Sequence, residues 1–428
     1  MSEYLIIQHE QFCGSLSGIK LPLDKSLEYY FFKNRGMQKC FGIYPTENGH
    51  SVQLSYFIGA DWISEGEQAI YVEPKISGAS SKTDYLKMLF SALKHSEISN
   101  FTNELFEIKW GSKLIEINQQ QDLLTPLLVV QFLRIVQRIV RKGLKKSYYK
   151  VEHNLNGKVK GKVLVSKSIK QNLVKNKLLY TYCSYDEFGV NGLENRLLKK
   201  ALVFVLRYLP SMKNLNCDTY TENVFRFINP AFESVSEEVS LFDVKFTKTN
   251  VFYKEYDEAI KLAKLILKRF GYNITNIDKE TISTPPFWID MSKLFELYLL
   301  GYLKDKYGSD VHYQFNANYG NPDYLLNNDR IVADAKYKTY YNEPLRGQAQ
   351  WKRDSIASDV RQLSGYSRDK AILYEFGISE EESLKFVPEC LIFYPDQTTS
   401  EDLFENEKKE IIEFSNIYKQ PIRLPTIE

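Results

Sequence analysis

Two aspartates and a lysine lie close together in the stretch NPDYLLNNDRIVADAKYK. Asp323 precedes a short apolar run, an Asn-Asn-Asp turn follows, and Asp334 and Lys336 lie in a second run of apolar and β-branched residues. This pattern predicts a β-hairpin with strands at residues 324–326 and 331–337. Because side chains alternate along a strand, Asp334 and Lys336 share one face, and the turn brings Asp323 back beside Asp334.

Two carboxylates beside an ammonium group are suited to the hydrolysis of a phosphodiester. Carboxylate oxygens bind Mg²⁺, which lowers the pKa of a bound water and neutralises charge on the phosphate. The ammonium of Lys336 helps to orient or activate that water. A solvated surface hairpin with an Asp-containing turn has the same spacing, so the motif by itself leaves both interpretations open.

Three flanking features favour a catalytic hairpin over a solvated one. Apolar residues surround Asp334, and burying an unpartnered carboxylate among them would be costly. Upstream, Asp290 is placed to cap a helix with an apolar face, and Glu296 lies on that helix. Downstream, SDVRQLSGY puts Gln362 and Tyr366 four residues apart, on one face of a second helix.

Length and composition bound the class of protein. The 428 residues suffice for two or three domains, and a net charge of +2 gives no overall sign of a nucleic-acid partner. The five cysteines are scattered without a C-x-x-C pair, which favours a reducing interior over a disulfide framework or a zinc site. The chain begins without a signal-peptide pattern, and its apolar runs are too short to span a membrane. We therefore expect a soluble, cytoplasmic protein.

The hydrophobic pattern predicts a mixed α/β (α+β) chain in three parts. Residues 1–120 alternate short apolar runs with turns, which indicates a strand-rich mixed domain. Residues 121–280 combine helices with a basic hairpin. The TISTPP segment marks a boundary before the third part, 281–428, because paired prolines end helices.

Further elements are expected from periodicity within these parts. In the third part, strands are predicted at 371–374 and 391–394, and a short helix in the charged tail after Asp396. Besides the helix that Asp290 caps, helices are predicted at 85–95, 123–144, 192–209, 253–270 and 355–367.

A strongly basic segment runs from Arg134 to Lys177. It contains fourteen Lys and Arg residues against Glu152 alone. Lys158, Lys160 and Lys162 lie in its glycine-flanked centre, NGKVKGKV. Such a segment is either a solvated face or a surface that binds DNA or an acidic partner protein.

The same NGKVKGKV stretch does not meet the requirements of a phosphate-binding loop. Gly157 and Gly161 are separated by three residues rather than four, and Val163 stands where a Ser or Thr must bind Mg²⁺. Since no other such loop is present in the sequence, we expect this chain to bind no nucleotide itself.

The order helix-Glu, PD, DAK and Q-x-x-x-Y resembles the PD-(D/E)xK nuclease fold in its RecB-like variety. Four segments are similar to McrC, the nuclease subunit of McrBC-type restriction systems: FWIDMSKLFELYLL, NPDYLL, IVADAKYK and SDVRQLSGYS. A second match is NLNGKVKGKV followed by CSYDEF and NRLLK. The resemblance spans most of residues 70–395 and is weak over the first 60.

The resemblance implies a Mg²⁺-dependent DNA endonuclease with a PD-(D/E)xK, restriction-endonuclease-like domain at 281–428. It implies that Asp323 and Asp334 ligate Mg²⁺, with the Ala335 carbonyl as a further ligand. Lys336 is then expected beside the attacking water.

Three more residues receive supporting roles from the resemblance. Glu296 is expected to reach the metal or its waters from its helix. Gln362 and Tyr366 are expected to hold the substrate or the catalytic strand, although a core-packed pair would show the same spacing.

The resemblance also implies partners and a biological role. In that family an McrB-like AAA+ GTPase ring recognises modified cytosine and translocates, while the McrC subunit docks on the ring with its N-terminal region, stimulates GTP hydrolysis and cuts double-stranded DNA. The helical and hairpin region at residues 121–280 is expected to provide docking contacts with the ring. Lys158, Lys160 and Lys162 would then contact either the ring or DNA. Two alternatives remain: a stand-alone RecB-like repair nuclease and a non-catalytic regulator of an AAA+ ring.

Overall fold

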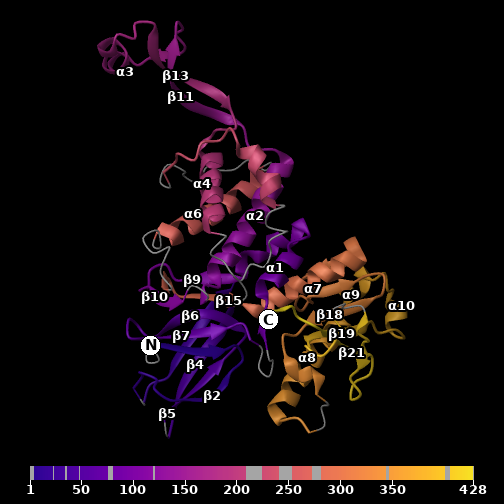
Figure 1. Ribbon diagram of the computed structural model, residues 1–428. Helices are drawn as coiled ribbons and strands as arrows, with labels where there is room; N and C mark the ends of the chain where they lie inside the picture. Colours follow the sequence, from indigo (N-terminus) through magenta and orange to yellow (C-terminus); the bar gives the residue numbers. More distant parts are fainter. Residues whose placement is uncertain are drawn as a thin grey trace. The chain divides into compact units, whose positions relative to one another are not determined.

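The computed structural model describes residues 4–22, 24–33, 36–47, 49–75, 81–118, 121–208, 224–240, 253–271, 281–343, 347–400 and 405–427. The chain forms two compact units, shown in Figure 1. The first combines Met1–Leu124 with Glu280–Glu428, and the second is Thr125–Lys279. Within the described ranges, no helix is both long and apolar enough to cross a membrane.

Two sheets occupy the N-terminal part of the first unit, as the strand-rich pattern predicts. Their strands are β1 (Leu5–His9), β2 (Cys13–Leu16), β3 (Leu27–Lys33), β4 (Gly36–Thr46), β5 (Gly49–Leu54), β6 (Phe57–Ser64), β7 (Gln68–Glu73), β9 (Phe106–Ile108) and β15 (Phe287–Asp290). The first sheet has the order β1-β7-β6-β15-β9 and the second β2-β5-β4-β3. Buried residues of both, including Phe41, Val52 and Val72, form one hydrophobic cluster.

Residues from late in the chain complete this part of the unit. Besides β15, they supply β14 (Thr281–Thr284), which pairs with β10 (Ile115–Asn118), and β22 (Thr426–Ile427), which pairs with β8 (Lys82–Thr83). Helix α1 (Tyr85–Ala92) and the 3₁₀ segment η1 (Ser96–Glu104) connect these strands. The first unit therefore contains both ends of the chain.

A six-stranded mixed sheet carries the predicted hairpin. Its order is β16-β17-β18-β19-β21-β20, in which the β18–β19 and β19–β21 pairs are parallel. Its strands are β16 (Val311–Tyr313), β17 (Tyr324–Leu326), β18 (Ile331–Ala335), β19 (Glu389–Pro395), β20 (Lys409–Glu410) and β21 (Ile417–Ile422). The accompanying helices are α7 (Met291–Tyr307), η7 (Gly308–Asp310), η8 (Thr339–Asn342), α8 (Gln350–Tyr366), α9 (Lys370–Glu375) and α10 (Glu380–Ser383).

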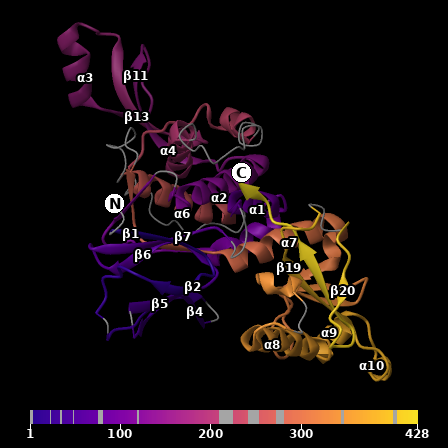
Figure 2. The same cartoon turned by 60° about the horizontal axis from the view of Figure 1, so that its bottom comes forward.

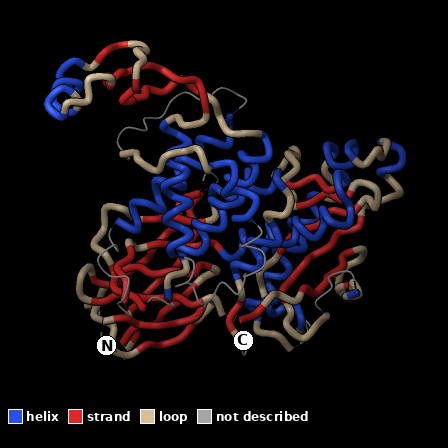
Figure 3. Tube along the Cα trace, turned by 45° about the horizontal axis from the view of Figure 1, so that its top comes forward, coloured by secondary structure: helices blue, strands red, loops and turns tan. Residues whose placement is uncertain are grey.

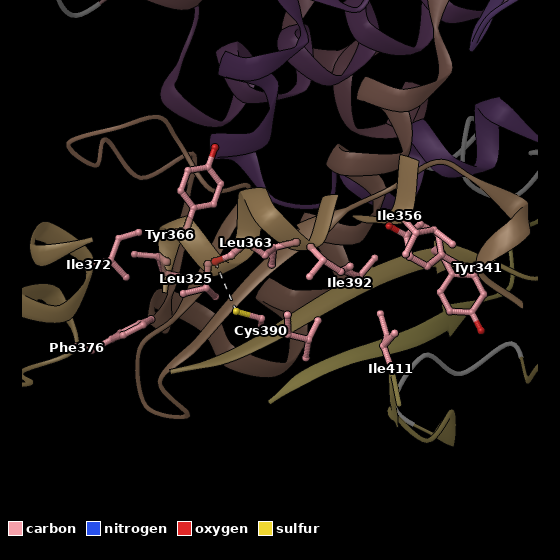
Figure 4. Packing of buried hydrophobic residues seen from close by; sticks show 14 of the residues in the cluster. Leu325, Tyr341, Ile356, Leu363, Tyr366, Ile372, Phe376, Cys390, Ile392 and Ile411 are labelled. Carbon is pink, nitrogen blue, oxygen red and sulfur yellow. Dashed lines mark hydrogen bonds between the residues drawn. The ribbon is translucent and has the colours of Figure 1, made fainter. Parts of the chain in front are cut away.

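Helix α8 packs on this sheet through a cluster of buried side chains, shown in Figure 4. Ile356 and Leu363 of α8 lie in one cluster with Val332 of β18 and Ile392 of β19. The residues at positions 356, 360 and 363 fall on one helical face, which explains why α8 lies flat on the strands. This contact positions α8 beside the hairpin.

The start of α7 follows the sequence prediction. Asp290 is the N-cap residue, and its Oδ1 accepts a hydrogen bond from the Lys293 backbone N–H at 3.0 Å. The helix ends at Gly308, whose φ of 57° lies in the left-handed region that favours glycine. The predicted cap is thus confirmed.

Three local predictions are wrong. The predicted strand at 371–374 lies in helix α9, because Asp369 caps the helix by accepting a hydrogen bond from the Ala371 N–H at 2.8 Å. The described part of the charged tail forms strands β20, β21 and β22 instead of a short helix. The second hairpin strand ends at Ala335 rather than at residue 337.

The second unit consists of helices and a protruding hairpin. Its elements are α2 (Leu124–Lys142), β11 (Ser147–Asn156), β12 (Lys162–Val163), α3 (Val165–Gln171), η3 (Leu173–Lys175), β13 (Tyr180–Gly189), α4 (Leu193–Tyr208), η5 (Asn229–Phe232) and α6 (Lys254–Gly271). Strand β13 pairs with β11 and β12. We call residues 147–189 the arm, which extends away from α2, α4 and α6 with α3 at its far end (Figures 1, 2 and 3).

A buried carboxylate connects β1 to the hairpin within the first unit. Glu10 is fully buried, and its Oε1 accepts a hydrogen bond from the Tyr337 hydroxyl at 3.1 Å. Burial raises the pKa of Glu10 to about 8, and the charge of Asp290 acts in the same direction, whereas the hydrogen bond from Tyr337 opposes both. The folded protein therefore holds a proton on Glu10 at pH values where the unfolded chain releases it.

We expect Glu10→Gln to remove a pH-dependent loss of stability. Because the folded-state pKa is raised, the wild-type protein loses stability as pH rises from the unfolded value toward about 8. A glutamine carries no proton to lose, so the variant should exceed wild type by roughly 3–5 kcal/mol in free energy of unfolding above pH 8 and by little near pH 5. Urea unfolding at both pH values, with exposed Glu381→Gln as the control, measures this; equal pH slopes in wild type and Glu10→Gln would contradict it.

Candidate active site

The two aspartates of the predicted pair face each other across the hairpin. Strands β17 and β18 pair Tyr324 with Ala333. Asp323 directly precedes Tyr324 and Asp334 directly follows Ala333, so in this antiparallel register the two aspartates lie opposite each other. Directly opposite residues of antiparallel strands have neighbouring side chains on one face of the sheet. The Ala335 backbone N–H also donates a hydrogen bond to Asp323 Oδ2 at 2.9 Å, which holds the first carboxylate against the second strand.

The two carboxylates are destabilised as a pair of anions. Burial raises the pKa of Asp323, and the charges of Asp334 and Glu296 raise it further. Burial likewise raises the pKa of Asp334, which is only 3% exposed, while the Lys336 ammonium opposes this shift. A cation between these oxygens would relieve the unfavourable charge. The donor set therefore fits a divalent ion that prefers oxygen ligands.

The backbone of Ala335 adds an oxygen to the same place. The N–H and C=O groups of one residue in an antiparallel ladder point toward the same neighbouring strand. Since the Ala335 N–H reaches Asp323, its carbonyl also faces the side on which Asp323 lies. This orientation is consistent with the predicted carbonyl ligand.

Lys336 is held in its charged form next to Asp334. Its Nζ forms an ion pair with Asp334 Oδ2 and donates a hydrogen bond to Gln362 Oε1 at 3.0 Å. Burial favours the neutral amine, but the charges of Asp334, Asp359 and Asp323 outweigh burial and raise the pKa of Lys336. An ammonium can orient a water molecule and neutralise anionic charge, but it cannot act as a general base.

Gln362 and Tyr366 lie on α8 beside the lysine, as their spacing predicts. Gln362 is exposed and joins the two groups, because its Nε2 donates a hydrogen bond to Tyr366 Oη at 3.1 Å while its Oε1 accepts from Lys336. The Tyr366 side chain is mostly buried and belongs to the cluster that packs α8 on the sheet, and in Figure 4 its ring points away from the strands. The pair thus anchors the lysine to α8.

Glu296 is held by a neighbouring network on α7. Its Oε1 accepts hydrogen bonds from Tyr313 Oη at 2.6 Å, from Gln314 Nε2 at 2.9 Å and from Lys293 Nζ at 3.1 Å. Its backbone carbonyl accepts a hydrogen bond from Tyr324 Oη at 2.6 Å. Among the described residues, no group of three or more His, Cys, Asp and Glu side chains is placed to hold one metal ion. Glu296 therefore influences Asp323 through its charge, and its predicted contact with a metal stays a prediction.

A further carboxylate at this site was missed by the sequence analysis. Asp359 of α8 is 7% exposed, and its Oδ2 accepts hydrogen bonds from Tyr341 Oη at 2.6 Å and Lys338 Nζ at 2.7 Å. Its Oδ1 lies 3.7 Å from Lys336 Nζ. Helical spacing could have indicated that Asp359 lies near the site, because Asp359 precedes Gln362 by three residues and so lies on the same face of the helix.

The predicted basic residues of the arm lie in the second unit. Lys158 and Lys162 are exposed, and neither forms an ion pair within the described parts of the chain. Lys160 Nζ lies 3.5 Å from Glu187 Oε1 and 4.0 Å from the centre of the Tyr185 ring. The arm therefore presents cations of which some are balanced locally and others are not.

Comparisons with known proteins identify the family. A family model described as "McrBC 5-methylcytosine restriction system component" matches residues 52–372, and no curated protein matches. Two solved structures from Thermococcus gammatolerans are similar at 15% identity. One is a refined half-complex of McrB AAA+ hexamers with bound McrC, with a TM-score of 0.35 over 90% of this chain and 81% of that chain. The other is a cryo-EM structure of the McrBC complex, with a TM-score of 0.30 over 70% of this chain and 87% of that chain.

The family model covers well over half of the residues of this chain. The chain therefore belongs to the family of McrBC 5-methylcytosine restriction system components.

Proposed function

We propose that this chain is the DNA-cleaving subunit of an McrBC-type restriction complex, with a nuclease centre of the PD-(D/E)xK kind. The observation that carries the proposal is the pair of carboxylates that face each other beside the charged Lys336: Asp323, which is half-buried, and Asp334, which is buried. Family membership supports the role in restriction. A scaffold without activity has no need of such a destabilised pair of anions.

Asp323, Asp334 and the Ala335 carbonyl would hold Mg²⁺, which supplies a Lewis acid that activates water and neutralises phosphate charge. Lys336 orients the attacking water and places a positive charge beside the scissile phosphate. Gln362 keeps the lysine in position through its 3.0 Å hydrogen bond, and Tyr366 supports Gln362 from the core. These contacts pre-organise the lysine before DNA arrives.

We further propose that an AAA+ GTPase ring of the McrB type directs this cleavage to DNA containing modified cytosine. The proposal is supported by family membership, and the sequence contains no recognisable phosphate-binding loop. Nucleotide hydrolysis would then belong to the ring. The ring, rather than this chain, would then select the modified site.

The arm is the part of the chain that we propose to dock on the ring. Its far end exposes a set of large apolar side chains together with its lysines. DNA phosphates require cations, whereas exposed apolar side chains are typical of a protein interface. The combination favours docking on an acidic and partly apolar protein surface over DNA binding. These side chains, with their exposed fractions, are Val159 (65%), Val165 (60%), Leu173 (59%), Val174 (76%), Leu178 (71%) and Leu179 (72%).

A reconstitution with the partner ring tests the proposed function. The purified chain alone is expected to hydrolyse neither GTP nor ATP and to cut little DNA, and adding the ring with GTP should start cleavage of modified DNA. Reversing Lys158, Lys160 and Lys162 to Glu should abolish stimulation of GTP hydrolysis measured without DNA. A control with Lys94, Lys385 and Lys409 reversed has the same charge change on exposed residues outside the arm.

The outcomes separate the alternatives. Robust cleavage by the isolated chain without nucleotide would favour a stand-alone nuclease. The arm would be a DNA-binding surface instead if its variant stimulated GTP hydrolysis normally but bound DNA with a smaller salt dependence. The slope of log affinity against log salt concentration would then fall by roughly 0.9 for each lost phosphate contact. A variant unchanged in both assays would identify the lysines as a solvated face.

A further inference from the structure

A groove lies directly beside the proposed nuclease centre, between the start of α9 and the loop that precedes β17. It has a volume of about 640 Å³. Gln362 and Tyr366 are among its lining residues, and Gln362 also accepts a hydrogen bond from Lys336. A single side chain, Gln362, therefore contacts the lysine of the proposed centre and lines the groove.

Two exposed arginine residues line this groove. Arg361 lies on α8 and Arg368 just beyond its end, and neither forms an ion pair with any described residue. Gly365 lies between them in the sequence, and apart from its chain neighbours and the backbone of α8 no described atom lies within 4 Å of where its Cβ would be. Arg361 and Gly365 are four residues apart on α8 and so share one face, and Arg368 follows in the turn after the helix. All three residues line the groove, so it has two cations and a position without a side chain. This arrangement suits an anionic chain lying along α8.

Tyr319 lies at the opposite edge of the groove and is held in an exposed position. Its side chain is 92% exposed, although the loop that carries it is firmly attached. The Asp369 carboxylate accepts hydrogen bonds from the Asn318 N–H at 3.0 Å, from Asn318 Nδ2 at 2.8 Å and from the Tyr319 N–H at 3.3 Å. Asp369 also caps α9, so the loop and the helix share one anchor.

Gly320 brings this loop close to the catalytic helix. Its φ of 119° lies in the region that favours glycine, and an added Cβ would come within 2.9 Å of Tyr366 Oη. The backbone of the loop thus rests on the tyrosine that supports Gln362. An aromatic ring kept in solvent by a buried carboxylate and a close backbone contact has no evident role in folding.

We propose that this groove binds a locally unpaired stretch of the DNA strand adjacent to the scissile phosphate, with Arg361 and Arg368 on its phosphates and Tyr319 stacked on one of its bases. Base faces stack on aromatic side chains without regard to sequence, and free guanidinium groups bind phosphates. The groove therefore holds the strand in the cleavage centre without selecting its sequence. This inference rests on the proposed nuclease function and adds the residues that position its substrate.

Binding of a single-stranded oligodeoxynucleotide by the full-length chain tests the groove. Ca²⁺ replaces Mg²⁺ to prevent cleavage, and all variants carry Lys158→Ala, Lys160→Ala and Lys162→Ala so that the arm does not dominate the affinity. Tyr319→Ala should weaken binding about tenfold. Arg361→Ala with Arg368→Ala should reduce the log–log salt slope by about 1.4, or roughly 0.7 for each phosphate contact on a single strand.

Matched controls lie outside the groove on the same unit. Tyr374 is 84% exposed on α9, and Lys385 is exposed; Tyr374→Ala and Lys385→Ala should leave affinity and salt slope unchanged. A local readout is photo-crosslinking: Tyr319→p-benzoylphenylalanine should crosslink to the oligonucleotide and Tyr374→p-benzoylphenylalanine should not.

Three outcomes would overturn the proposal that the groove binds DNA. They are equal affinities of the Tyr319 and Tyr374 variants, no crosslink at position 319, and no measurable binding by the parent protein. The proposed nuclease function is tested separately by cleavage with Asp334→Ala in the reconstituted complex. If Asp334→Ala lost cleavage while Tyr319→Ala bound the oligonucleotide as tightly as the parent protein, the proposed DNA-binding groove would be wrong and the proposed nuclease function would stand.

Discussion

Asp334→Ala is expected to lower the rate of Mg²⁺-dependent DNA cleavage by the reconstituted complex by on the order of 10³-fold. The reason is that one of the two facing carboxylates is lost, and with it several kcal/mol of transition-state stabilisation by the metal. Lys336→Ala should act in the same direction, because it removes the ammonium that lies beside Asp334. Single-turnover cleavage of modified DNA measures both effects.

The control for these variants is Asp329→Ala, which removes an exposed carboxylate from the turn of the same hairpin. It should cut at the wild-type rate. Stimulation of GTP hydrolysis should remain near normal in all three variants, since the proposed docking surface lies on the arm. Cleavage near the wild-type rate in Asp334→Ala or Lys336→Ala would remove these residues from the active centre.

Withdrawal of divalent cations should have a similarly large effect, on stability as well as on activity. Chelation is expected to abolish cleavage. In addition, Mg²⁺ should stabilise the folded chain, because it relieves the unfavourable charge of Asp323 and Asp334 and binds the folded state alone. At about 100 times its dissociation constant, one bound ion contributes about 2.7 kcal/mol.

Thermal unfolding with and without Mg²⁺, at constant ionic strength, checks this stabilisation. Wild type and Asp329→Ala should gain stability on addition of the ion, whereas Asp334→Ala should gain little. An equal gain in all three proteins would place the bound ion elsewhere.

The central part of the site could be predicted from sequence because it is local. A turn between two short strands places Asp323 opposite Asp334, and strand alternation puts Lys336 on the same face. Helical spacing likewise placed Gln362 and Tyr366 together. Each of these inferences needed the geometry of only one element or one hairpin.

Other features depend on contacts that sequence periodicity does not contain. Glu10 and Tyr337 are 327 residues apart in the chain, so only the folded first unit brings them together. The apolar run after Lys370 is too short to distinguish a strand from a helix, and the cap from Asp369 decided the outcome. The same residue anchors the Tyr319 loop, a contact that no local pattern indicates.

The most direct test of the account is to locate the metal on the chain. Fe²⁺ can be bound in place of Mg²⁺ and treated with peroxide and ascorbate, so that radicals formed at the ion cut the nearest backbone. We predict cuts next to Asp323 and within residues 334–336, suppressed by excess Mg²⁺ and lost in Asp334→Ala. Cuts confined to other parts of the chain, or unchanged in that variant, would contradict the assignment of this hairpin as the nuclease centre.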